Sequence, residues 1–394
     1  MTEKNSIINC ANKNGGMTSR ERVLAAFQRK SVDYVPCCLS FNSLMPEQRM
    51  GYKYQFPFID SMPERLEYCC NNLGTDQMVN AIIERFYPDK GVYASKWFRN
   101  NEIHKKWITP SGELYAVAKY DEKWPFGLDI PFYHDFTGHY IKPWLSTSSD
   151  LECLRHILRP LATKEQLEEV RFNFMQKKHL ADQYQLAIIS QVGSGLTGAL
   201  QMFTATELCY RIMDEPELID GYLELEHTVN MKHMEIMLEL GADIIGRNGF
   251  YETADFYSPE MLKQFVEKRL QEEIRIVHEA DRLIGYTAHT GITPLIQYLS
   301  KLDFDCIMHI DIAHSSNDIQ KIHKELCDRK SIIAGPSNTY HMWSNDTNIV
   351  RKAVDDVFEI FGKDGLLISP CPSAHSIMPW ENTLAIVDEW KKLR

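Results

Sequence analysis

The sequence predicts an α/β fold, a (β/α)8 TIM barrel with an N-terminal extension and an aromatic-rich insertion. Short runs of apolar, β-prone residues alternate with amphipathic helical segments along the chain of 394 residues. Most of these runs are apolar throughout, which is typical of parallel strands buried on both faces. Six such units in the C-terminal part and two more near 35–41 and 76–83 make eight, which favours a closed barrel over an open sheet.

The expected strands and helices follow one another in a regular order. The six C-terminal strands are LAIISQV (186–192), ADIIGRN (242–248), RLIGYTA (282–288), FDCIMHI (304–310), SIIAGPS (331–337) and GLLISPC (365–371). The first helix begins at a capping box of Thr18 and Glu21, and a later helix begins at Ser258 with Pro259 in its first position. The other expected helices are 205–241 with a break near Pro216, 294–301, 317–328, 347–362 and 380–393.

We expect a single catalytic domain at 18–394, preceded by a loose polar tail at 1–17. Residues 84–150 are rich in Trp, Tyr, Phe and Pro, and we interpret them as an insertion near the barrel mouth. The glycines of GSGLTG (193–198) have the wrong spacing for a dinucleotide-binding loop or a P-loop. The sequence therefore contains neither of these nucleotide-binding motifs.

Charge and composition exclude several classes of partner. The net charge is −11, the pI is about 5.7 and no long basic run is present, so nucleic acid is a poor partner. The N-terminus lacks the apolar core of a signal peptide, and no stretch approaches the roughly 18–20 apolar residues of a membrane span. We therefore expect a cytoplasmic enzyme that contacts no membrane and whose ten cysteines are mostly reduced and buried.

Polar residues gather where the predicted strands end, which is where TIM-barrel enzymes carry their active sites. One His, one Cys and one carboxylate can hold zinc through three ligands and leave a fourth position open. The candidates at these ends are Glu252, Asp255, His289, Asp311 and Cys371. The residues alone leave a structural alternative open. In that alternative His289 and His309 are hydrogen-bonded packing residues, Cys371 fills a gap in the core, and the carboxylate of Glu252 is solvated.

Several segments resemble the uroporphyrinogen decarboxylase superfamily. They are TSRERVLAAFQRKSVDYVPC, LGADIIGRNGFYETADFYSPEMLKQFV, AHTGITPLIQYL and GLLISPCPSAHSIMPWENTLAIVDEW. The resemblance covers most of the chain and implies a TIM barrel, in agreement with the strand count. The superfamily contains cofactor-free decarboxylases with an Arg-rich signature near the N-terminus, and zinc-dependent methyltransferases that work with corrinoid proteins. Here the corresponding segment is CCLSFNSLMPEQRMG, which lacks that signature, so porphyrinogen decarboxylation is not expected.

The resemblance to the methyltransferase branch implies a set of zinc ligands. In its coenzyme M members a His-x-Cys pair at one strand end and a Cys near the C-terminus hold the metal. His289 falls at the family histidine and Cys371 within one residue of the C-terminal cysteine, but residues 290–292 contain no cysteine. A carboxylate in place of one thiolate suits an oxygen donor better than a thiol. We therefore expect Glu252 as the third ligand, with Asp255, Asp311 and His375 as alternatives.

These expectations define a working function. The protein would move a methyl group from a methoxylated, aromatic substrate to the cobalt(I) of a corrinoid (cobalamin) held by a partner protein, with Zn²⁺ activating the ether oxygen. Tyr251, Asp311 and His314 are the candidate catalytic residues, and Asn248 and Asn338 are the candidate substrate-binding residues. The resemblance is equally compatible with a monomer and with a homodimer.

Three rival functions remain open from the sequence. The first is methyl transfer from another small donor or to a thiol such as coenzyme M. The second is a metal-free, decarboxylase-like lyase, which requires arginines at the mouth, where only Arg247 is expected. The third is a binding protein on the same barrel that has lost its metal.

Overall fold

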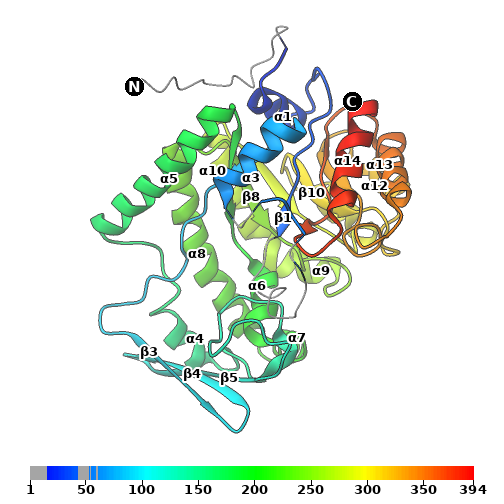
Figure 1. Ribbon diagram of the computed structural model, residues 1–394. Helices are drawn as coiled ribbons and strands as arrows, with labels where there is room; N and C mark the ends of the chain where they lie inside the picture. Colours follow the sequence, from blue (N-terminus) through cyan, green and yellow to red (C-terminus); the bar gives the residue numbers. More distant parts are fainter. Residues whose placement is uncertain (1–15, 43–52, 54, 59–60) are drawn as a thin grey trace.

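The computed structural model describes residues 16–42, 53, 55–58 and 61–394. Seven parallel strands form one sheet in the order β12-β11-β10-β9-β8-β7-β2. The segment at Cys37 and Cys38 joins the two edges, because Cys37 forms a parallel bridge with Ile368 of β12 and Cys38 forms one with Asp76, just before β2. The seven strands and this segment close into a barrel of eight, which confirms the predicted TIM barrel (Figure 1).

The barrel strands overlap the predicted ranges. They are β2 (Met78–Asn80), β7 (Ala187–Val192), β8 (Ile244–Asn248), β9 (Leu283–Thr287), β10 (Cys306–Asp311), β11 (Ser331–Gly335) and β12 (Leu366–Ile368). Beyond the bridges, the closing segment continues as the short strand β1 (Phe41–Asn42), which pairs in parallel with β13 (Ala374–His375). Most of the segment CCLSFNSLMPEQRMG, and residues 1–15 of the predicted tail, lie outside the described residues.

Helices follow the barrel strands as predicted. The longer helices are α1 (Ser19–Phe27), α4 (Ser148–Leu154), α5 (Lys164–Tyr184), α6 (Gly195–Phe203), α7 (Ala205–Asp214), α8 (Pro216–Leu240), α10 (Lys268–Glu279), α12 (Ile319–Leu326), α13 (Thr347–Phe361) and α14 (Trp380–Leu393). Shorter helical segments are α3 (Met62–Glu67), η1 (Tyr68–Leu73), η2 (Thr137–His139), α9 (Pro259–Leu262), η3 (Lys263–Glu267), η4 (Thr293–Leu295) and α11 (Ile296–Leu299). The break at Pro216 separates α7 from α8, and the capping box of Thr18 and Glu21 is formed. Ser258 caps α9 by accepting a hydrogen bond from the backbone N–H of Met261 at 3.2 Å.

The barrel lumen has its own small apolar core, and α1 closes its amino end. Val23, Ala26 and Phe27 of α1 belong to the same buried cluster as the inward-facing strand residues. Those residues are Ala187, Ile189, Ile244, Leu283, Cys306, Met308, Ile333 and Leu367. Because side chains alternate along a strand, these residues define which positions of each strand face the lumen.

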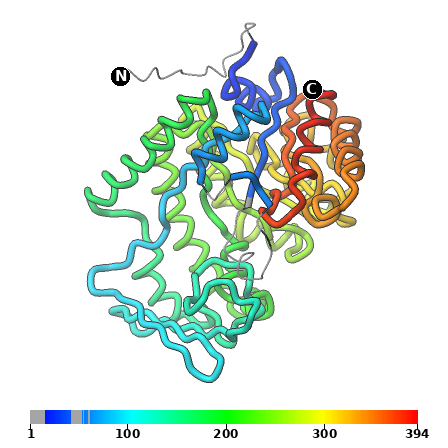
Figure 2. Tube along the Cα trace, viewed as in Figure 1, coloured from blue at the N-terminus to red at the C-terminus, as the bar shows by residue number. Residues whose placement is uncertain are grey.

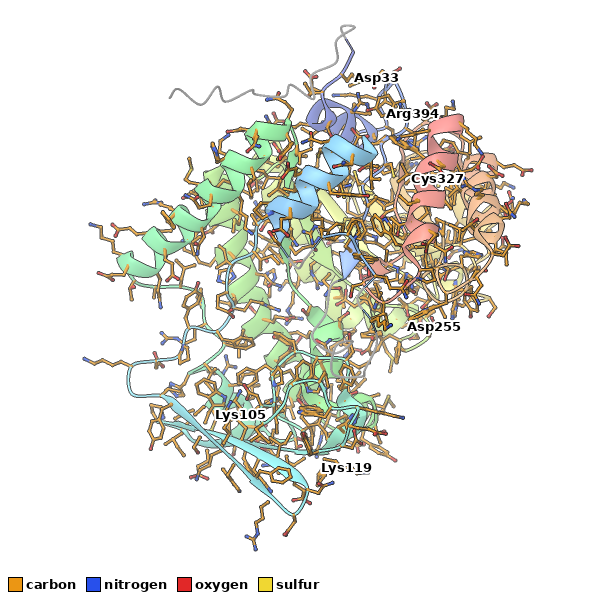
Figure 3. The ribbon with its side chains drawn as sticks, in the orientation of Figure 1. Asp33, Lys105, Lys119, Asp255, Cys327 and Arg394 are labelled. Carbon is orange, nitrogen blue, oxygen red and sulfur yellow. The ribbon has the colours of Figure 1, made fainter. Side chains whose placement is uncertain are left out.

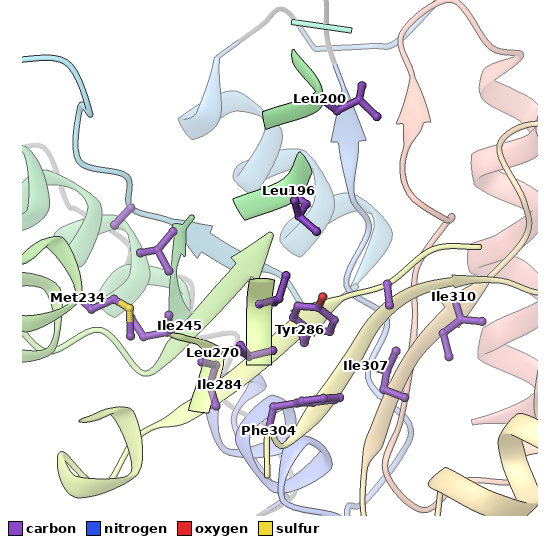
Figure 4. Close-up of a cluster of buried hydrophobic side chains, with 14 of the residues drawn as sticks. Leu196, Leu200, Met234, Ile245, Leu270, Ile284, Tyr286, Phe304, Ile307 and Ile310 are labelled. Atoms are coloured by element: carbon purple, nitrogen blue, oxygen red, sulfur yellow. The ribbon is translucent and has the colours of Figure 1, made fainter. Parts of the chain in front are cut away.

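A larger apolar layer lies between the strands and the surrounding helices (Figure 4). Outward-facing Ile245, Ile284 and Ile307 pack there against helix residues such as Leu270 of α10. The phenol ring of Tyr286 also lies in this layer, with its ring centroid 5.4 Å from that of Phe304. The alternation between lumen and helix layer therefore decides where each polar strand residue points.

A second, antiparallel sheet, in the order β3-β4-β5-β6, precedes most of the barrel in the chain. Its strands are β3 (Tyr93–Arg99), β4 (Glu102–Thr109), β5 (Gly112–Lys119) and β6 (Tyr140–Lys142). Phe132 and Trp144, with ring centroids 4.7 Å apart, belong to the core beneath this sheet. The amide of Gln201 in α6 donates a hydrogen bond to Asp135 Oδ1 at 2.8 Å, so this region is bonded to the helix that follows β7 (Figure 1).

The N-terminal segment runs beside the last helix, α14 (Figure 2). Trp390 Nε1 donates a hydrogen bond to the Val35 carbonyl at 2.6 Å, and the Arg394 guanidinium lies 4.6 Å from the Tyr34 ring centroid. No helix within the described ranges is long and apolar enough to cross a membrane. The nine cysteines that the structure describes are all free thiols.

Candidate active site

The carboxyl ends of the barrel strands lie on the side of the antiparallel sheet. In Figure 3, Asp255 marks this side together with Lys105 and Lys119 of the antiparallel sheet, whereas Asp33 and Arg394 mark the opposite end. Every second residue of a strand faces the lumen, and this alternation extends to residues at the mouth. They are Asn80, Gln191 and Asn248 on β2, β7 and β8, and His289, Ser337 and Cys371 just beyond β9, β11 and β12.

A bulge in β10 adds two further side chains to the mouth. The pairing of β10 with β11 shifts register between Ile307 and Ile310, and both isoleucines pack in the helix layer. Met308 and His309 therefore both lie on the lumen side, and Asp311 faces the lumen again after Ile310. His309 has a φ of 68°, a left-handed conformation that few non-glycine residues adopt.

The bulge also orients His289. Nδ1 of His289 lies 2.7 Å from the His309 carbonyl oxygen, which can only accept, so Nδ1 carries the proton and Nε2 keeps a lone pair. The ring stacks on Phe250 at 5.1 Å between centroids, and Nε2 lies 3.7 Å from Asp311 Oδ2. Burial lowers the pKa of His289, although the His309 carbonyl and Asp311 oppose it. A neutral imidazole fixed through Nδ1 by a carbonyl is the usual arrangement of a metal ligand.

Asp311 and Cys371 share this corner of the mouth. Asp311 Oδ2 accepts a hydrogen bond from Ser337 Oγ at 2.7 Å, and Oδ1 accepts one from the Ala313 N–H at 2.8 Å. Ser337 forms a parallel β-bridge with Cys371, whose buried thiol donates to the Ser369 carbonyl at 3.3 Å. Burial and the charge of Asp311 raise the pKa of Cys371 well above its usual range. A cation bound here would offset both effects.

The donors in this corner match zinc in kind. An imidazole nitrogen, a carboxylate oxygen and a thiol are the groups that zinc takes, and the Nε2 lone pair of His289 faces the carboxylate of Asp311. In the part of the chain that the structure describes, no three His, Cys, Asp or Glu side chains already enclose a point where an ion could sit. The thiol of Cys371 would have to leave the Ser369 carbonyl to reach a shared ion.

Glu252 is not brought to His289. Its carboxylate is fully buried and accepts hydrogen bonds from Tyr286 Oη at 2.6 Å and from the Leu196 N–H at 2.9 Å. Nη2 of Arg247 lies 3.4 Å from Oε1. Because Tyr286 and Arg247 both face the helix layer, their hydrogen bonds hold Glu252 outside the lumen, where burial raises its pKa.

Arg247 bonds with a second buried carboxylate. Its Nε donates to Glu273 Oε2 at 2.9 Å, and Glu273 is 1% exposed. Burial would lower the pKa of Arg247, but Glu252 and Glu273 together raise it. Burial likewise opposes ionisation of Glu273, but the charges and hydrogen bonds of Arg247 and His227 together outweigh this effect and lower the pKa of Glu273. The only arginine expected at the mouth is thus committed to two carboxylates in the helix layer.

The glycine-rich segment GSGLTG makes room for this ion-pair network. Gly195 has a φ of 47°, and a Cβ atom there would lie 2.1 Å from Glu252 Oε1 and 2.5 Å from Arg247 Nη2. A side chain at this position would therefore displace the carboxylate, and only glycine adopts the backbone conformation without strain. The segment serves packing around Glu252 rather than phosphate binding.

Tyr251 and Asn248 both contact Phe250, the residue that stacks on His289. Tyr251 packs edge-on against Phe250 at 4.8 Å, and its hydroxyl donates to Asp135 Oδ1 at 3.4 Å. Burial and Asp135 raise the pKa of Tyr251. Asn248 Oδ1 accepts a hydrogen bond from the Phe250 N–H at 3.1 Å. Both predicted residues are therefore near His289, and Tyr251 is bonded to the region of the antiparallel sheet.

His314 lies on the loop after β10. Its Nδ1 is 2.6 Å from Ser316 Oγ, which also accepts a hydrogen bond from the Gly291 N–H at 2.7 Å. His314 thus connects the loops after β9 and β10.

Asn338 follows β11 and is bonded to the C-terminal loop. Its N–H donates to the Cys371 carbonyl at 2.9 Å, and Nδ2 lies 3.3 Å from His375 Nε2. Asp255 is exposed on the loop after β8. The structure therefore gathers His289, Asp311 and Cys371 in one corner, with Asn338 and His375 beside them.

Four polar residues of the mouth were not among the predicted site residues. Asn80, Gln191 and His309 lie inside apolar runs, and Ser337 ends the run SIIAGPS. Asn80 Oδ1 and His309 Nδ1 are both buried, and neither has a hydrogen-bond partner within the described ranges. A polar residue inside or at the end of an apolar run is the signal that could have identified them.

The closed parallel barrel carries polar residues at the carboxyl ends of its strands, which is where enzymes with this fold have their active sites. The chain belongs to the uroporphyrinogen decarboxylase (URO-D) family, which matches residues 122–393. No curated protein sequence matches the chain.

Among solved structures, a methyltransferase from Methanosarcina mazei is similar over 95% of this chain and 99% of its own, with 16% identity and a TM-score of 0.58. A B12-independent methionine synthase from Shewanella sp. W3-18-1 is similar over 60% of this chain and 66% of its own, with 10% identity and a TM-score of 0.40. The first similarity shows that the two chains share a fold.

Proposed function

We propose that this protein is a methyltransferase that moves a methyl group from a methoxylated aromatic molecule to the cobalt(I) of a corrinoid held by a partner protein. The observation that carries the proposal is the His289–Asp311 pair, whose imidazole is fixed through Nδ1 and presents Nε2 to the carboxylate 3.7 Å away. Membership of the URO-D family and a fold shared with a methyltransferase support the same assignment.

In this proposal His289, Asp311 and Cys371 hold zinc, and Asp311 takes the part predicted for Glu252. Asp311 was among the alternatives, and it lies on the lumen side with His289, whereas Glu252 is committed to Arg247 and Tyr286. Zinc, when bound, supplies Lewis acidity at the ether oxygen of the donor. A site with one thiol, one imidazole and one carboxylate suits an oxygen donor.

The proposed transfer balances without an external oxidant. The bond between the methyl carbon and the aromatic oxygen would break, its electron pair would stay on the oxygen, which would take a proton from solvent, and the methyl group would pass to the cobalt(I) that the partner supplies. The chain contributes orientation: Phe250, stacked on His289, gives a flat ring a surface to lie against, and Asn248 fixes the backbone of Phe250.

The decarboxylase-like rival finds less support. A lyase without a metal needs cationic side chains to hold the carboxylates of its substrate. Arg247 is the only Lys or Arg within the described barrel strands, and its guanidinium is paired with Glu252 and Glu273. A side chain that is already ion-paired in the helix layer cannot receive a substrate carboxylate in the lumen.

The test is formation of methyl-cobalt. Zinc-loaded protein is mixed under anoxic conditions with a corrinoid protein in the cobalt(I) state and with guaiacol, veratrole, vanillate, methanol or methylamine. We expect the cobalt(I) absorption to be replaced by that of methyl-cobalt(III) with at least one aromatic methyl ether, and not with the His289→Ala variant. If no donor yields methyl-cobalt, the proposed function is wrong.

A further inference from the structure

Two buried polar atoms on opposite sides of the barrel have no hydrogen-bond partner among the residues that the structure describes. They are Asn80 Oδ1 on β2 and His309 Nδ1 on β10. Counting around the ring of eight from the closing segment, β2 is second and β10 is sixth, so the two strands are diametrically opposite. Buried polar groups without partners are rare in native proteins, so a matched pair across one lumen calls for an explanation.

Both side chains point into the lumen. Val79 packs in the helix layer and Met78 packs against the lumen core, so Asn80, two residues after Met78, faces inward. His309 faces inward because the β10 bulge leaves two residues between the outward-facing Ile307 and Ile310.

The two residues also lie at the same height. Along the sheet, Asn80 pairs with Ile189, Ile189 with Ile244, and Ile244 with Leu283. Because Gly285 pairs with Cys306 on β10, Leu283 lies opposite Phe304, two residues earlier. The strands of a TIM barrel are tilted against the barrel axis. After four strands, the residue at the same height along the axis is therefore about four positions further along its strand than the residue reached through the pairing. That shift leads from Phe304 to the position of the bulge at His309.

We infer that the lumen between Asn80 and His309 is a subsite for an uncharged, hydroxyl-bearing part of the methyl donor. The inference rests on the proposed function and names the class of its substrate. Asn80 Oδ1 can only accept a hydrogen bond, so the ligand must donate one, as a hydroxyl does. The Gln191 amide lies on the same side of the lumen, beside Gly246, where a Cβ atom would approach Gln191 Nε2 to 2.7 Å.

The charges around the subsite favour a neutral ligand over a carboxylate. Asp311 on the same strand carries a negative charge, and the Arg247 guanidinium is paired in the helix layer. Among methoxylated aromatics, guaiacol has a hydroxyl and no charge, veratrole lacks the hydroxyl, and vanillate adds a carboxylate.

The test is calorimetric binding of these three compounds to the zinc-loaded protein without any corrinoid protein. We expect guaiacol to bind tightest, about 3- to 10-fold tighter than veratrole, which is the ratio that one neutral hydrogen bond supplies. Vanillate should bind more weakly than guaiacol. Asn80→Ala and His309→Asn should each weaken guaiacol binding about 3- to 10-fold and leave veratrole binding unchanged. Asn at position 309 suits the positive φ, so this variant should fold.

His278→Gln is the matched control, because His278 pairs with Asp305 at the opposite end of the barrel, 3.1 Å from its carboxylate. It should bind all three compounds as the wild type does. Equal affinities for guaiacol and veratrole, tighter binding of vanillate, or no saturable guaiacol binding would each overturn the inference. If guaiacol binds and responds to both variants but yields no methyl-cobalt, the subsite stands and the proposed methyl transfer fails.

Discussion

The lumen side and the helix side of the same strands carry polar residues of different kinds. On the helix side, Arg247, Glu252 and Glu273 are buried and paired with one another. On the lumen side, Asn80 and His309 keep buried atoms that bond to no residue in the described part of the chain. Buried charges that pair with one another are costly to break apart, whereas groups left unsatisfied at the mouth are available to a ligand. Adjacent residues of β8, Arg247 and Asn248, show that one step along a strand decides which side of the sheet a polar side chain faces.

The largest expected effect comes from breaking the helix-side network at Arg247. Arg247→Met would leave Glu252 and Glu273 buried without their cation, which costs about 3–5 kcal/mol of unfolding free energy. Urea denaturation followed by circular dichroism measures this loss. An unchanged midpoint would show that the carboxylates do not depend on the guanidinium.

A smaller loss is expected when the space beside Glu252 is filled. Gly195→Ala would put a Cβ atom 2.1 Å from Glu252 Oε1 at a residue with φ of 47°. We expect about 1–3 kcal/mol of destabilisation from the clash and the strained backbone. Gly241→Ala is the control for the cost of backbone strain alone, because Gly241 has a φ of 99° and no atom lies within 4 Å of its Cβ position. Equal losses in the two variants would contradict the clash.

On the lumen side, Ser337 tests whether Asp311 is positioned for a metal. Ser337→Ala removes the 2.7 Å hydrogen bond to Asp311 Oδ2 and leaves the helix-side network intact. We expect zinc affinity to fall about 10-fold, as is usual when a hydrogen bond that supports a metal ligand is lost. Competition with a chromophoric chelator measures the change. Unaltered zinc affinity would separate Ser337 from the metal site.

The smallest effect concerns pH and belongs to the helix side. Burial lowers the pKa of His227, but Glu273 and Glu272 outweigh it and raise the pKa above its usual value. The protonated ring therefore contributes stability below the unfolded pKa of about 6.5, and this contribution is lost as pH rises through the folded pKa. As pH rises from about 6 to about 8.5, the wild type should lose more unfolding free energy than His227→Gln. Parallel pH profiles would contradict the pairing.

Much of the fold follows from the periodicity of the sequence. The runs LAIISQV and GLLISPC are apolar throughout and become β7 and β12, and Pro216 separates α7 from α8 as predicted. Of the predicted metal ligands, His289 and Cys371 lie on the lumen side. Each is an even number of residues beyond a strand residue that faces the lumen, Leu283 for His289 and Leu367 for Cys371.

The position of Glu252 could not be predicted in this way. Glu252 lies four residues beyond β8, where alternation no longer applies, and its place is set by Arg247, Tyr286 and the space at Gly195. These contacts join residues that are far apart in the chain.

His309 was missed for a different reason. Strict alternation along FDCIMHI would turn its side chain toward the helices, and only the register shift against β11 turns it toward the lumen. A bulge leaves no mark in the hydrophobic pattern, although a histidine within an apolar run is a hint that the strand is irregular.

The central claim is that the metal belongs to the lumen side of the strands, and the zinc content of matched variants tests it directly. His289→Ala and Glu252→Gln are purified, loaded with zinc, dialysed and analysed by mass spectrometry, with circular dichroism as the check on folding. The wild type and Glu252→Gln should retain about one equivalent of zinc, and His289→Ala less than about a tenth. Zinc lost from folded Glu252→Gln but kept by His289→Ala would contradict the account.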